Sequence, residues 1–360
     1  MSHSKKVMIS FFLTTKCNLD CVYCYTNKRK YKHQTLDFKF AQIGIDDFFK
    51  SNNSRHIRFF AAGEPTMEFE LMKKIREYAY EKTGNNLLVE TQTNGVFPIT
   101  IAKWLSTNID IIWVSLDGVP DVQNHYRPTI TGKPTSSVIE RNIKYLIRRG
   151  TCMVGIRSTI NNMNLYNQID NIRYFANLGV KYIWTDPMFP SIGEKDAYEE
   201  IDILEYAKEY LKAKKYADKY NIFYGSFLAC NFDEKTKYHC RACLPVPHLT
   251  TDGYVSACDM ALFGANNNHM SVFIYGKWDR RNNKIIYDEE KINYIKSRNV
   301  DNMPGCNNCI AKYHCGGYCL GEVMNETHNL FGKKERVCEA IRYLMRNMQT
   351  NMGCYKYLHP

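Results

Sequence analysis

The feature that most constrains this chain is a short loop with three cysteines, which directly follows an apolar run at residues 7–13. Cys17, Cys21 and Cys24 have the spacing CxxxCxxC, so their thiols can close on one soft metal centre. Three thiols are one fewer than a saturated tetrahedral site or an iron–sulfur cubane takes. A cluster held in this way keeps an open iron, at which a small molecule can be bound and reduced. A structural zinc knuckle is the alternative interpretation of the same loop.

The spacing, the strand-like segment before it and the aromatic Tyr23 just before the third cysteine resemble the radical S-adenosylmethionine (SAM) superfamily. The resemblance implies that Cys17, Cys21 and Cys24 hold a [4Fe-4S] cluster, that the methionyl amine and carboxylate of SAM chelate its unique iron, and that Tyr23 contacts SAM. It also implies that the reduced cluster cleaves SAM to methionine and a 5′-deoxyadenosyl radical, which abstracts hydrogen from an unactivated C–H bond.

From residue 7 to about 225, short β-rich runs alternate with longer helical patterns, which is typical of βα units around a parallel sheet. Strands are expected at 7–13, 56–61, 87–92, 109–115, 152–159 and 181–185, and helices at 37–51, 67–83, 99–107, 136–149, 166–178 and about 197–220. Six strands and six helices fit an α/β fold, a partial, open (β/α)6 TIM barrel, which the resemblance also implies. In such barrels the chemistry lies at the carboxyl ends of the strands.

Several predicted strands end in motifs that resemble SAM-binding segments of this family. After the second strand, Ala61-Ala62-Gly63-Glu64-Pro65 resembles the GGEP motif, so Ala62, Gly63 and Glu64 are expected near the methionyl amine. The third strand ends Gln92-Thr93-Asn94-Gly95 and the fourth ends Ser115-Leu116-Asp117-Gly118. By analogy, Ser115 and Asp117 are placed near the ribose hydroxyls, with Thr93 and Asn94 as second choices. Each motif alone is also an ordinary turn sequence.

Two further segments complete the barrel part. Arg157, in the fifth predicted strand, can meet the SAM carboxylate through its planar guanidinium, and a salt bridge at the barrel mouth is the competing interpretation. His125-Tyr126-Arg127-Pro128 resembles an H-x-x-R variant found in related enzymes with peptide substrates. We expect this segment to organise the site structurally rather than to transfer protons.

Beyond residue 225 the βα rhythm stops and cysteines gather. The pattern matches the seven-cysteine SPASM domain, a C-terminal extension of many radical SAM maturases, and implies two auxiliary [4Fe-4S] clusters. Carried over by position, Cys243, Cys258 and Cys319 hold the first auxiliary cluster, and Cys306, Cys309, Cys315 and Cys338 hold the second. Cys240 is our choice over Cys230 for the remaining ligand of the first, unless that cluster keeps an open iron. We expect a barrel at residues 1–225, a SPASM domain at 226–345 and a tail at 346–360.

One acidic residue follows a cluster cysteine directly. Asp259, next to Cys258, matches a candidate general base of the anaerobic sulfatase-maturating branch, and many other SPASM proteins also carry an acid there. The unassigned Cys152, Cys230 and Cys354 are expected to be buried hydrophobes or surface thiols.

Composition and charge limit the remaining classes of partner. The chain has 360 residues, no visible signal peptide and no run of about 18 apolar residues, so we expect a cytoplasmic protein that does not enter the membrane. The formal net charge is +11, but the basic residues are scattered apart from Lys28 to Lys32, so no nucleic-acid site is expected. The absent export signal favours reduced, metal-binding cysteines over disulfides.

Together these features predict a radical SAM/SPASM maturase that oxidatively modifies a side chain of a peptide or protein, for example by a thioether or carbon–carbon cross-link. Its cofactors would be three [4Fe-4S] clusters and SAM, and its electron donor a flavodoxin or ferredoxin. The alternative is an anaerobic sulfatase-maturating enzyme that converts Cys or Ser to formylglycine. A non-catalytic iron–sulfur or zinc-binding adaptor is the more distant alternative. Because the first strand begins by residue 7, we expect the barrel mouth, the SPASM domain or a separate protein to recognise the substrate.

Overall fold

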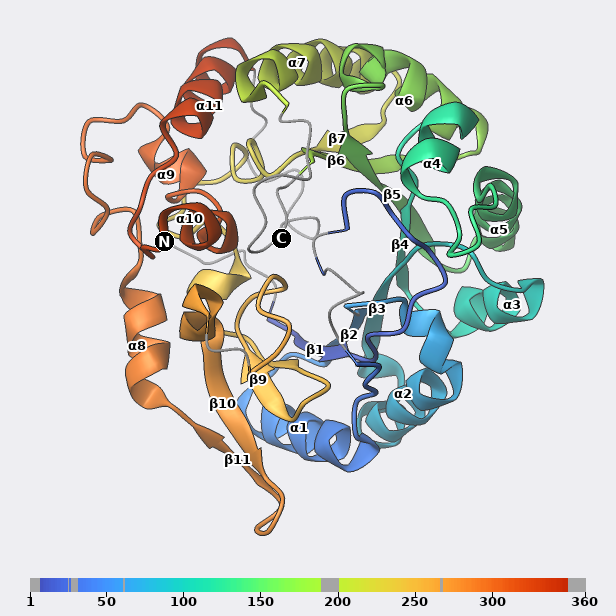
Figure 1. Cartoon of the computed structure of the whole chain (residues 1–360), viewed down its shortest axis with the longest axis vertical. Helices are drawn as coiled ribbons and strands as arrows, with labels where there is room; N and C mark the ends of the chain where they lie inside the picture. Colours follow the sequence, from blue (N-terminus) through green and yellow to red (C-terminus); the bar gives the residue numbers. More distant parts are fainter. Residues whose placement is uncertain are drawn as a thin grey trace.

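The computed structural model describes residues 7–24, 26, 32–60, 62–188, 201–265 and 268–348. Seven strands, each parallel to the next, follow one another in chain order and curve around a common interior (Figure 1). They are β1 (Ile9–Phe12), β2 (His56–Phe60), β3 (Leu88–Thr93), β4 (Ile111–Ser115), β5 (Met153–Ile160), β6 (Tyr182–Pro187) and β7 (Phe223–Gly225). The predicted α/β barrel and its six strands are confirmed, and β7 is added.

The connecting helices form the outer ring of this barrel (Figure 1). They are α1 (Phe38–Ser51), α2 (Phe69–Thr83), α3 (Ile99–Asn108), α4 (Pro120–Tyr126), α5 (Ser136–Arg149), α6 (Gln168–Asn177) and α7 (Ile203–Lys219). All six helices expected from the sequence are present. The sequence did not predict α4 or β7, because a helix of two turns and a strand of three residues are too short to show a periodic pattern.

Alternation along the strands separates an apolar outer face from a polar inner face. Ile57 and Phe59 of β2 belong to the main hydrophobic core, which packs between the sheet and the helices. His56 and Arg58 lie between them in the sequence and therefore point into the barrel, although both are buried. The same alternation turns Glu90 of β3 inward, where its carboxylate lies 3.2 Å from the His56 ring. The interior of the barrel therefore carries charged side chains.

The cysteine-rich part extends the same sheet instead of forming a separate one. Strand β8 (His248–Leu249) pairs in parallel with β1, and three antiparallel strands follow to give one sheet of eleven strands. These strands are β9 (Tyr254–Ser256), β10 (Ile274–Asp279) and β11 (Lys284–Tyr287). At the other end of the chain, α11 (Glu335–Asn347) confirms the expected helical tail and packs against α7 (Figure 1). The cysteine-rich part is thus attached to both sides of the barrel.

The remaining elements are short. Helices α8 (Glu289–Ser297), α9 (Lys312–Cys315) and α10 (Leu320–Thr327) connect the cysteine-rich loops. Single 3₁₀ turns lie at η2 (Pro65–Glu68), η3 (Gly84–Asn86), η4 (Leu165–Asn167), η5 (Arg241–Cys243) and η6 (His269–Phe273).

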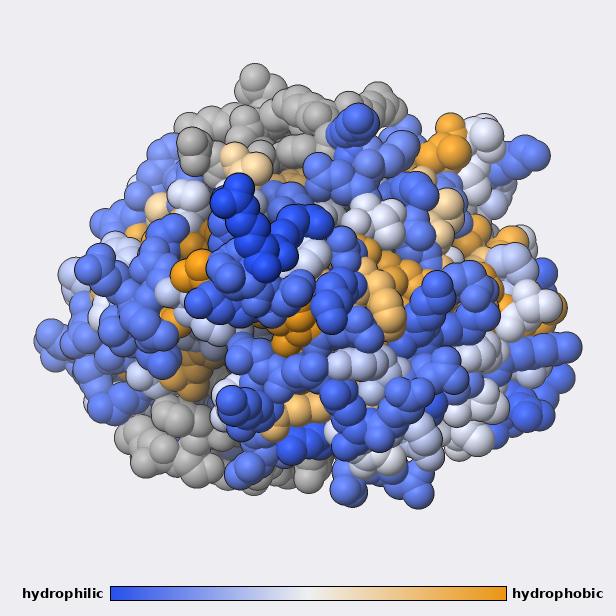
Figure 2. Space-filling model, turned by 90° about the horizontal axis from the view of Figure 1, so that it is seen from below, coloured by the Kyte–Doolittle hydropathy of each residue, from blue (hydrophilic) through white to orange (hydrophobic). Residues whose placement is uncertain are grey.

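Some sequence expectations concern residues outside the described ones. These are the polar start at 1–6, most of the basic patch at 28–31, Cys354 and the proposed tail from residue 349 onward. In the described part of the chain, no helix combines the length and apolar character that crossing a bilayer requires. The face of the molecule in Figure 2 is mostly hydrophilic, with small apolar groups between the polar ones.

Candidate functional site

The end of β2 packs directly against the backbone that leads into the three-cysteine loop. The amide of Gly63 donates to the carbonyl of Thr14 at 3.1 Å, and the amide of Glu64 donates to the carbonyl of Lys16 at 2.7 Å. A Cβ atom on Gly63 would lie only 1.9 Å from that Lys16 oxygen. Only glycine permits such an approach, so the Gly-Glu-Pro motif fixes the chain just before Cys17.

The carboxylate of Glu64 is occupied by the protein itself. Its Oε1 accepts from the Thr66 amide at 3.1 Å, the Thr66 hydroxyl at 2.8 Å and the Thr93 hydroxyl at 2.6 Å, and its Oε2 accepts from the Asn94 amide at 2.6 Å. Burial raises the pKa of Glu64, although these hydrogen bonds oppose the shift. Since a carboxylate offers about four acceptor positions, Glu64 joins the end of β2 to the end of β3.

The end of β3 in turn holds the start of the cysteine loop. The Asn94 amide nitrogen lies 2.7 Å from Asn18 Oδ1 and 3.9 Å from the Cys17 sulfur. The Asn18 side chain also donates to the carbonyl of Val96 at 2.7 Å. The Thr-Asn-Gly motif therefore orients the backbone and thiol of the first cysteine.

A second segment pairs with the cysteine loop along its backbone. Residues 126–130, which begin in the predicted H-x-x-R motif, run antiparallel to residues 18–22. The amides of Asp20 and Val22 donate to the carbonyls of Pro128 and Tyr126, both at 2.9 Å, and the amide of Ile130 donates to Asn18 at 3.1 Å. This geometry supports the structural role expected for the motif, and exposed His125 makes none of these contacts.

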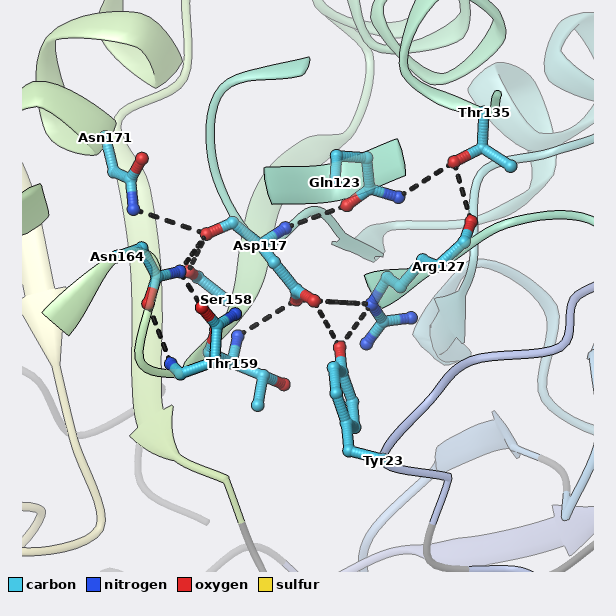
Figure 3. Close-up of polar contacts among 10 residues, drawn as sticks. Tyr23, Asp117, Gln123, Arg127, Thr135, Ser158, Thr159, Asn164 and Asn171 are labelled. Atoms are coloured by element: carbon cyan, nitrogen blue, oxygen red, sulfur yellow. Dashed lines mark hydrogen bonds and ion pairs between the residues drawn. The ribbon is translucent and has the colours of Figure 1, made fainter. Parts of the chain in front are cut away.

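Tyr23, Asp117 and Arg127 form a buried cluster beneath the same loop (Figure 3). The Tyr23 phenol donates to Asp117 Oδ2, and Arg127 Nε donates to the phenol oxygen at 2.5 Å and to Asp117 Oδ2 at 3.1 Å. Asp117 Oδ1 accepts from the Thr159 amide at 3.1 Å. Burial raises the pKa of Tyr23 well above its usual value, so the phenol stays protonated.

The backbone of Asp117 is held as firmly as its side chain. Its carbonyl accepts from Ser158, Asn164 and Asn171, and its amide donates to the Gln123 side chain at 3.0 Å (Figure 3). Asp117 has no exposed surface. The Asp-Gly motif thus joins the ends of β4 and β5 to the cysteine loop, which places Asp117 beneath the loop rather than on an open surface.

The predicted residues at the ends of β4 and β5 face the barrel interior. Ser115 and Arg157 are register partners, and the guanidinium of Arg157 lies 3.5 Å from Asp186 and over the ring of Trp184. The ion pair is the alternative that the sequence offered for Arg157. Burial raises the pKa of Asp186 to about 7, although Arg157 and hydrogen bonds from the Phe227 amide, Trp184 and Ser226 act against it.

Asp259 lies among three basic side chains. Its carboxylate is paired with Arg58, with Arg241 at 2.9 Å and with His248 at 3.0 Å. Burial alone would raise the pKa of Asp259, but the two arginines and His248 hold it well below its usual value. Burial lowers the pKa of His248 to about 4. The predicted general base is therefore an anion anchored between the inner face of β2 and the turn that carries Cys240 and Cys243.

The structure brings Cys240, Cys243, Cys258 and Cys319 together. Cys240 and Cys243 are hydrogen-bonded through their thiols, and Cys240 contributes to the raised pKa of both Cys258 and Cys319, which burial raises first. A Cβ on Gly321, two residues beyond Cys319, would lie 3.0 Å from the Cys258 sulfur. The set contains Cys240, the residue chosen for the fourth position.

Cys230 lies elsewhere. It belongs to a small buried cluster with Trp113 and Trp184 in the barrel, and its sulfur is 3.8 Å from His239.

The other four cysteines line one cavity. Cys306, Cys309, Cys315 and Cys338 surround a recess of about 470 Å³, solvent at its mouth included. Burial raises the pKa of Cys315 to about 12, and the neighbouring thiols of Cys338 and Cys306 add to the shift. Buried thiols that raise each other's pKa favour metal binding, because coordination removes the proton and spreads the charge. This set is the one that the sequence assigned to the second auxiliary cluster.

The spacing of the ligands bears on the type of metal centre. Within the described ranges, no three His, Cys, Asp or Glu side chains converge as they would around a single ion. Zinc gathers all its ligands about 2.3 Å from one centre, whereas each cysteine of a cubane binds a different iron. The two sets of four thiols therefore fit iron–sulfur clusters better than zinc.

Several residues of the interior were missed by the sequence analysis. Arg58, Arg241, His248 and Asp186 surround the predicted Asp259 and Arg157. Charged residues at alternate positions of otherwise apolar strands, as in His56-Ile57-Arg58-Phe59, were the available signal.

Comparison with known proteins matches residues 11–178 to the Radical SAM superfamily. The serine-type anaerobic sulfatase-maturating enzyme of Bacteroides thetaiotaomicron is 25% identical over 236 residues, which are 61% of this chain and 55% of that protein. The radical SAM cyclopropyl synthase TigE of Paramaledivibacter caminithermalis is 23% identical over 381 residues, covering 97% of this chain and 75% of that protein.

Two solved structures share the fold over most of this chain. The enzyme anSMEcpe with bound AdoMet and the Kp18Cys peptide has a TM-score of 0.73 at 18% identity and covers 94% of this chain and 95% of that one. SuiB of Streptococcus suis bound to its precursor peptide SuiA has a TM-score of 0.68 at 16% identity, with 93% and 76% covered. The shared fold includes the cysteine-rich C-terminal part.

Proposed function

This chain contains a radical SAM domain at residues 11–178, and from this premise we propose that it is a peptide or protein maturase that removes hydrogen from a substrate side chain or Cα. The observation that carries the proposal is the closure of four strand ends on the three-cysteine loop. Gly63, Asn94, Asp117 and the segment 126–130 all hold that loop at the carboxyl ends of the strands, where barrel enzymes bind their substrates.

We propose that Cys17, Cys21 and Cys24 hold the SAM-cleaving cluster. A cluster in this position supplies the electron that cleaves SAM. Ala62, Gly63 and Thr93 with Asn94 shape the backbone at one side of the cofactor, while Ser115 and Arg157 face it from the inner surface of β4 and β5. Glu64 and Asp117 act from beneath, since the protein already satisfies their carboxylates.

We further propose that the two sets of four cysteines hold auxiliary [4Fe-4S] clusters, which take up the electron left after hydrogen removal. A cross-link balances in this way: the substrate loses two hydrogens, one as an atom to the deoxyadenosyl group and one as a proton and an electron. The electron passes to an auxiliary cluster and then to a flavodoxin or ferredoxin. Short peptides and proteins with a flexible segment are the substrate class, as in the peptide-bound relatives.

Formation of formylglycine is the second candidate, and the position of Asp259 favours it. Asp259 faces the barrel interior beside Cys258 and could accept a substrate proton. Arg58, Arg241 and His248 keep it ionised, so it would act as a base only after the substrate displaces one of these partners. Exchange of the Cys sulfur for oxygen, rather than loss of two hydrogens, identifies this reaction by mass.

The test is anaerobic. The protein is reconstituted, reduced with dithionite and mixed with SAM, and iron, sulfide and 5′-deoxyadenosine are quantified. Three clusters correspond to about twelve irons, and a variant with Cys17, Cys21 and Cys24 all changed to Ala should keep about eight irons and form no deoxyadenosine. Little iron and no deoxyadenosine in the unchanged protein, under several reductants, would instead support the adaptor.

A further inference from the structure

Arg298 is the largest side chain that the described part of the chain buries completely. It follows the last residue of α8 and donates only to main-chain carbonyls: Leu330 at 2.6 Å, Gly317 at 2.7 Å and Tyr318 at 3.2 Å. Among the described residues, no carboxylate pairs with it. A buried cation without an opposite charge is strongly unfavourable, so the fold must supply a negative charge in another form.

The guanidinium lies against the segment that joins the two cysteine sets. Gly317 and Tyr318 stand between Cys315, which lines the cavity, and Cys319, which belongs to the other set. A Cβ on Gly317 would be 3.4 Å from Arg298 Nη1. The charge also reaches a second member of each set, because Arg298 lowers the pKa of both Cys243 and Cys306 against the effect of burial.

The other charges nearby are already compensated. Glu322, close to Cys319, accepts from Lys334 at 3.1 Å and from the Tyr318 hydroxyl at 2.8 Å. Lys333, close to Cys306, pairs with Glu335 at 2.6 Å. Arg298 thus contributes an uncompensated positive charge between the two cysteine sets.

We propose that Arg298 is the shared counter-charge of the two auxiliary clusters, stabilising their loaded state and raising their reduction potentials. This inference rests on the proposed function, because it requires that both sets hold clusters. A cluster with four thiolate ligands is anionic and gains a further negative charge on reduction. A fixed cation in a low-dielectric interior therefore stabilises the reduced form more than the oxidised form.

A purely structural role is the competing explanation. Gly316, Gly317 and Tyr318 have φ values of +63°, +88° and +62°, and Tyr318 is not a glycine. Hydrogen bonds from Arg298 to two of these carbonyls also hold the strained turn in place. Charge and hydrogen bonding must therefore be separated by substitution.

Two variants make this separation. Arg298→Lys keeps the charge but loses the planar fork, whereas Arg298→Gln keeps an amide donor for the carbonyls but loses the charge. Arg280→Gln, an exposed residue after β10, is the matched control for loss of one positive charge. Each full-length holoprotein is reconstituted anaerobically, its iron is counted, and the clusters are titrated redox-potentiometrically with EPR detection. Addition of SAM identifies the signal of the first cluster.

At full iron content, Arg298→Gln should weaken reduction of the auxiliary clusters about tenfold, which is about 59 mV for a one-electron couple. Arg298→Lys should shift them by less than half as much, and the first cluster and Arg280→Gln should be unchanged. Release of auxiliary iron to a chelator should be faster in Arg298→Gln than in Arg298→Lys. Equal shifts in both variants, no shift, or equal loss of clusters would overturn the charge role. About four irons in the unchanged protein would instead contradict the auxiliary clusters themselves.

Discussion

Arg127 Nε lies 2.5 Å from the phenol oxygen of Tyr23, although 104 residues separate them in the chain. Both side chains meet on Asp117, and Tyr23 directly precedes the third cysteine of the cluster loop. The loop is therefore anchored to the barrel by a side-chain cluster as well as by the backbone pairing of residues 18–22 with 126–130. Its orientation depends on contacts far from the cysteines.

We expect Arg127→Lys to loosen this loop. A lysine keeps the charge but cannot contact the phenol and the carboxylate together, and each charge-assisted hydrogen bond contributes about 1.5–3 kcal/mol. Hydrogen exchange at the amides of Asp20 and Val22 should accelerate in the cluster-free protein, and deoxyadenosine formation should fall at least about tenfold, equivalent to about 1.4 kcal/mol. The neighbouring variant His125→Gln, at an exposed position, serves as the control. Unchanged exchange in Arg127→Lys would show that backbone pairing alone holds the loop.

Gly63→Ala should be more damaging than its small size suggests. The new Cβ would meet the Lys16 carbonyl at 1.9 Å, so the backbone before Cys17 must move. We expect a loss of stability at or above the upper end of about 1–3 kcal/mol for overpacking, together with loss of about four of twelve irons.

Gly132→Ala gives the control for Gly63→Ala. This glycine has φ +76°, and a Cβ added to it would meet no atom within 4 Å, so the change costs about 1–2 kcal/mol through the backbone alone. Its iron content should stay complete. Thermal unfolding and iron analysis of both variants measure the difference, and full iron in Gly63→Ala would contradict the close contact as a requirement.

The sequence predicted the barrel because its elements depend on local patterns. The spacing of apolar residues in β1 to β6 and in the long helices is a property of each segment, so the strands and helices were found within a few residues. The roles of Glu64 and Asp117 were harder to predict. Both were expected near SAM because of their motifs, whereas their carboxylates bind Thr93, Asn94 and Tyr23 inside the protein. Which partner a buried carboxylate binds depends on tertiary contacts that spacing does not encode.

Arg298 and Asp186 were not recognised for the same reason. Arg298 stands in an ordinary polar segment after a helix, and only the fold shows that it is buried between two cysteine sets. Asp186 lies near the end of β6, where a polar residue was to be expected, but its raised pKa depends on burial by segments from other parts of the chain. Cysteine spacing, by contrast, proposed Cys240 as a cluster ligand, and its neighbours in the structure support that proposal.

The choice between Cys240 and Cys230 can be tested by iron content. Cys240→Ala should lose the first auxiliary cluster, about four of twelve irons, because its thiol lies among Cys243, Cys258 and Cys319. Cys230→Ala should keep all the iron, since Cys230 packs against Trp113 and Trp184 instead. EPR of the reduced proteins distinguishes the clusters that remain. Equal iron in Cys240→Ala and the unchanged protein would mean that this cluster has an open iron or another ligand.

The ion pair of Arg157 and Asp186 makes the stability of the barrel depend on pH. Burial raises the pKa of Asp186 to about 7 in the folded chain, from an ordinary value of about 3.9 in the unfolded chain. Between these two values the folded state binds more protons, so the contribution of Asp186 to stability decreases as the pH rises from about 4 to 7 and is constant above that range.

Asp186→Asn removes this titration while keeping a neutral acceptor for the Phe227 amide. Relative to the variant, the unchanged protein should therefore lose stability over that window, by at most about 4 kcal/mol for three pKa units. Anaerobic thermal unfolding of both holoproteins at pH 5.5, 6.5 and 7.5, chosen inside and just above the window (about pH 4 to 7), measures the difference. The direction separates two views of Asp186: a constant difference would mean that Arg157 keeps the carboxylate ionised throughout, and a growing one that burial dominates the ion pair.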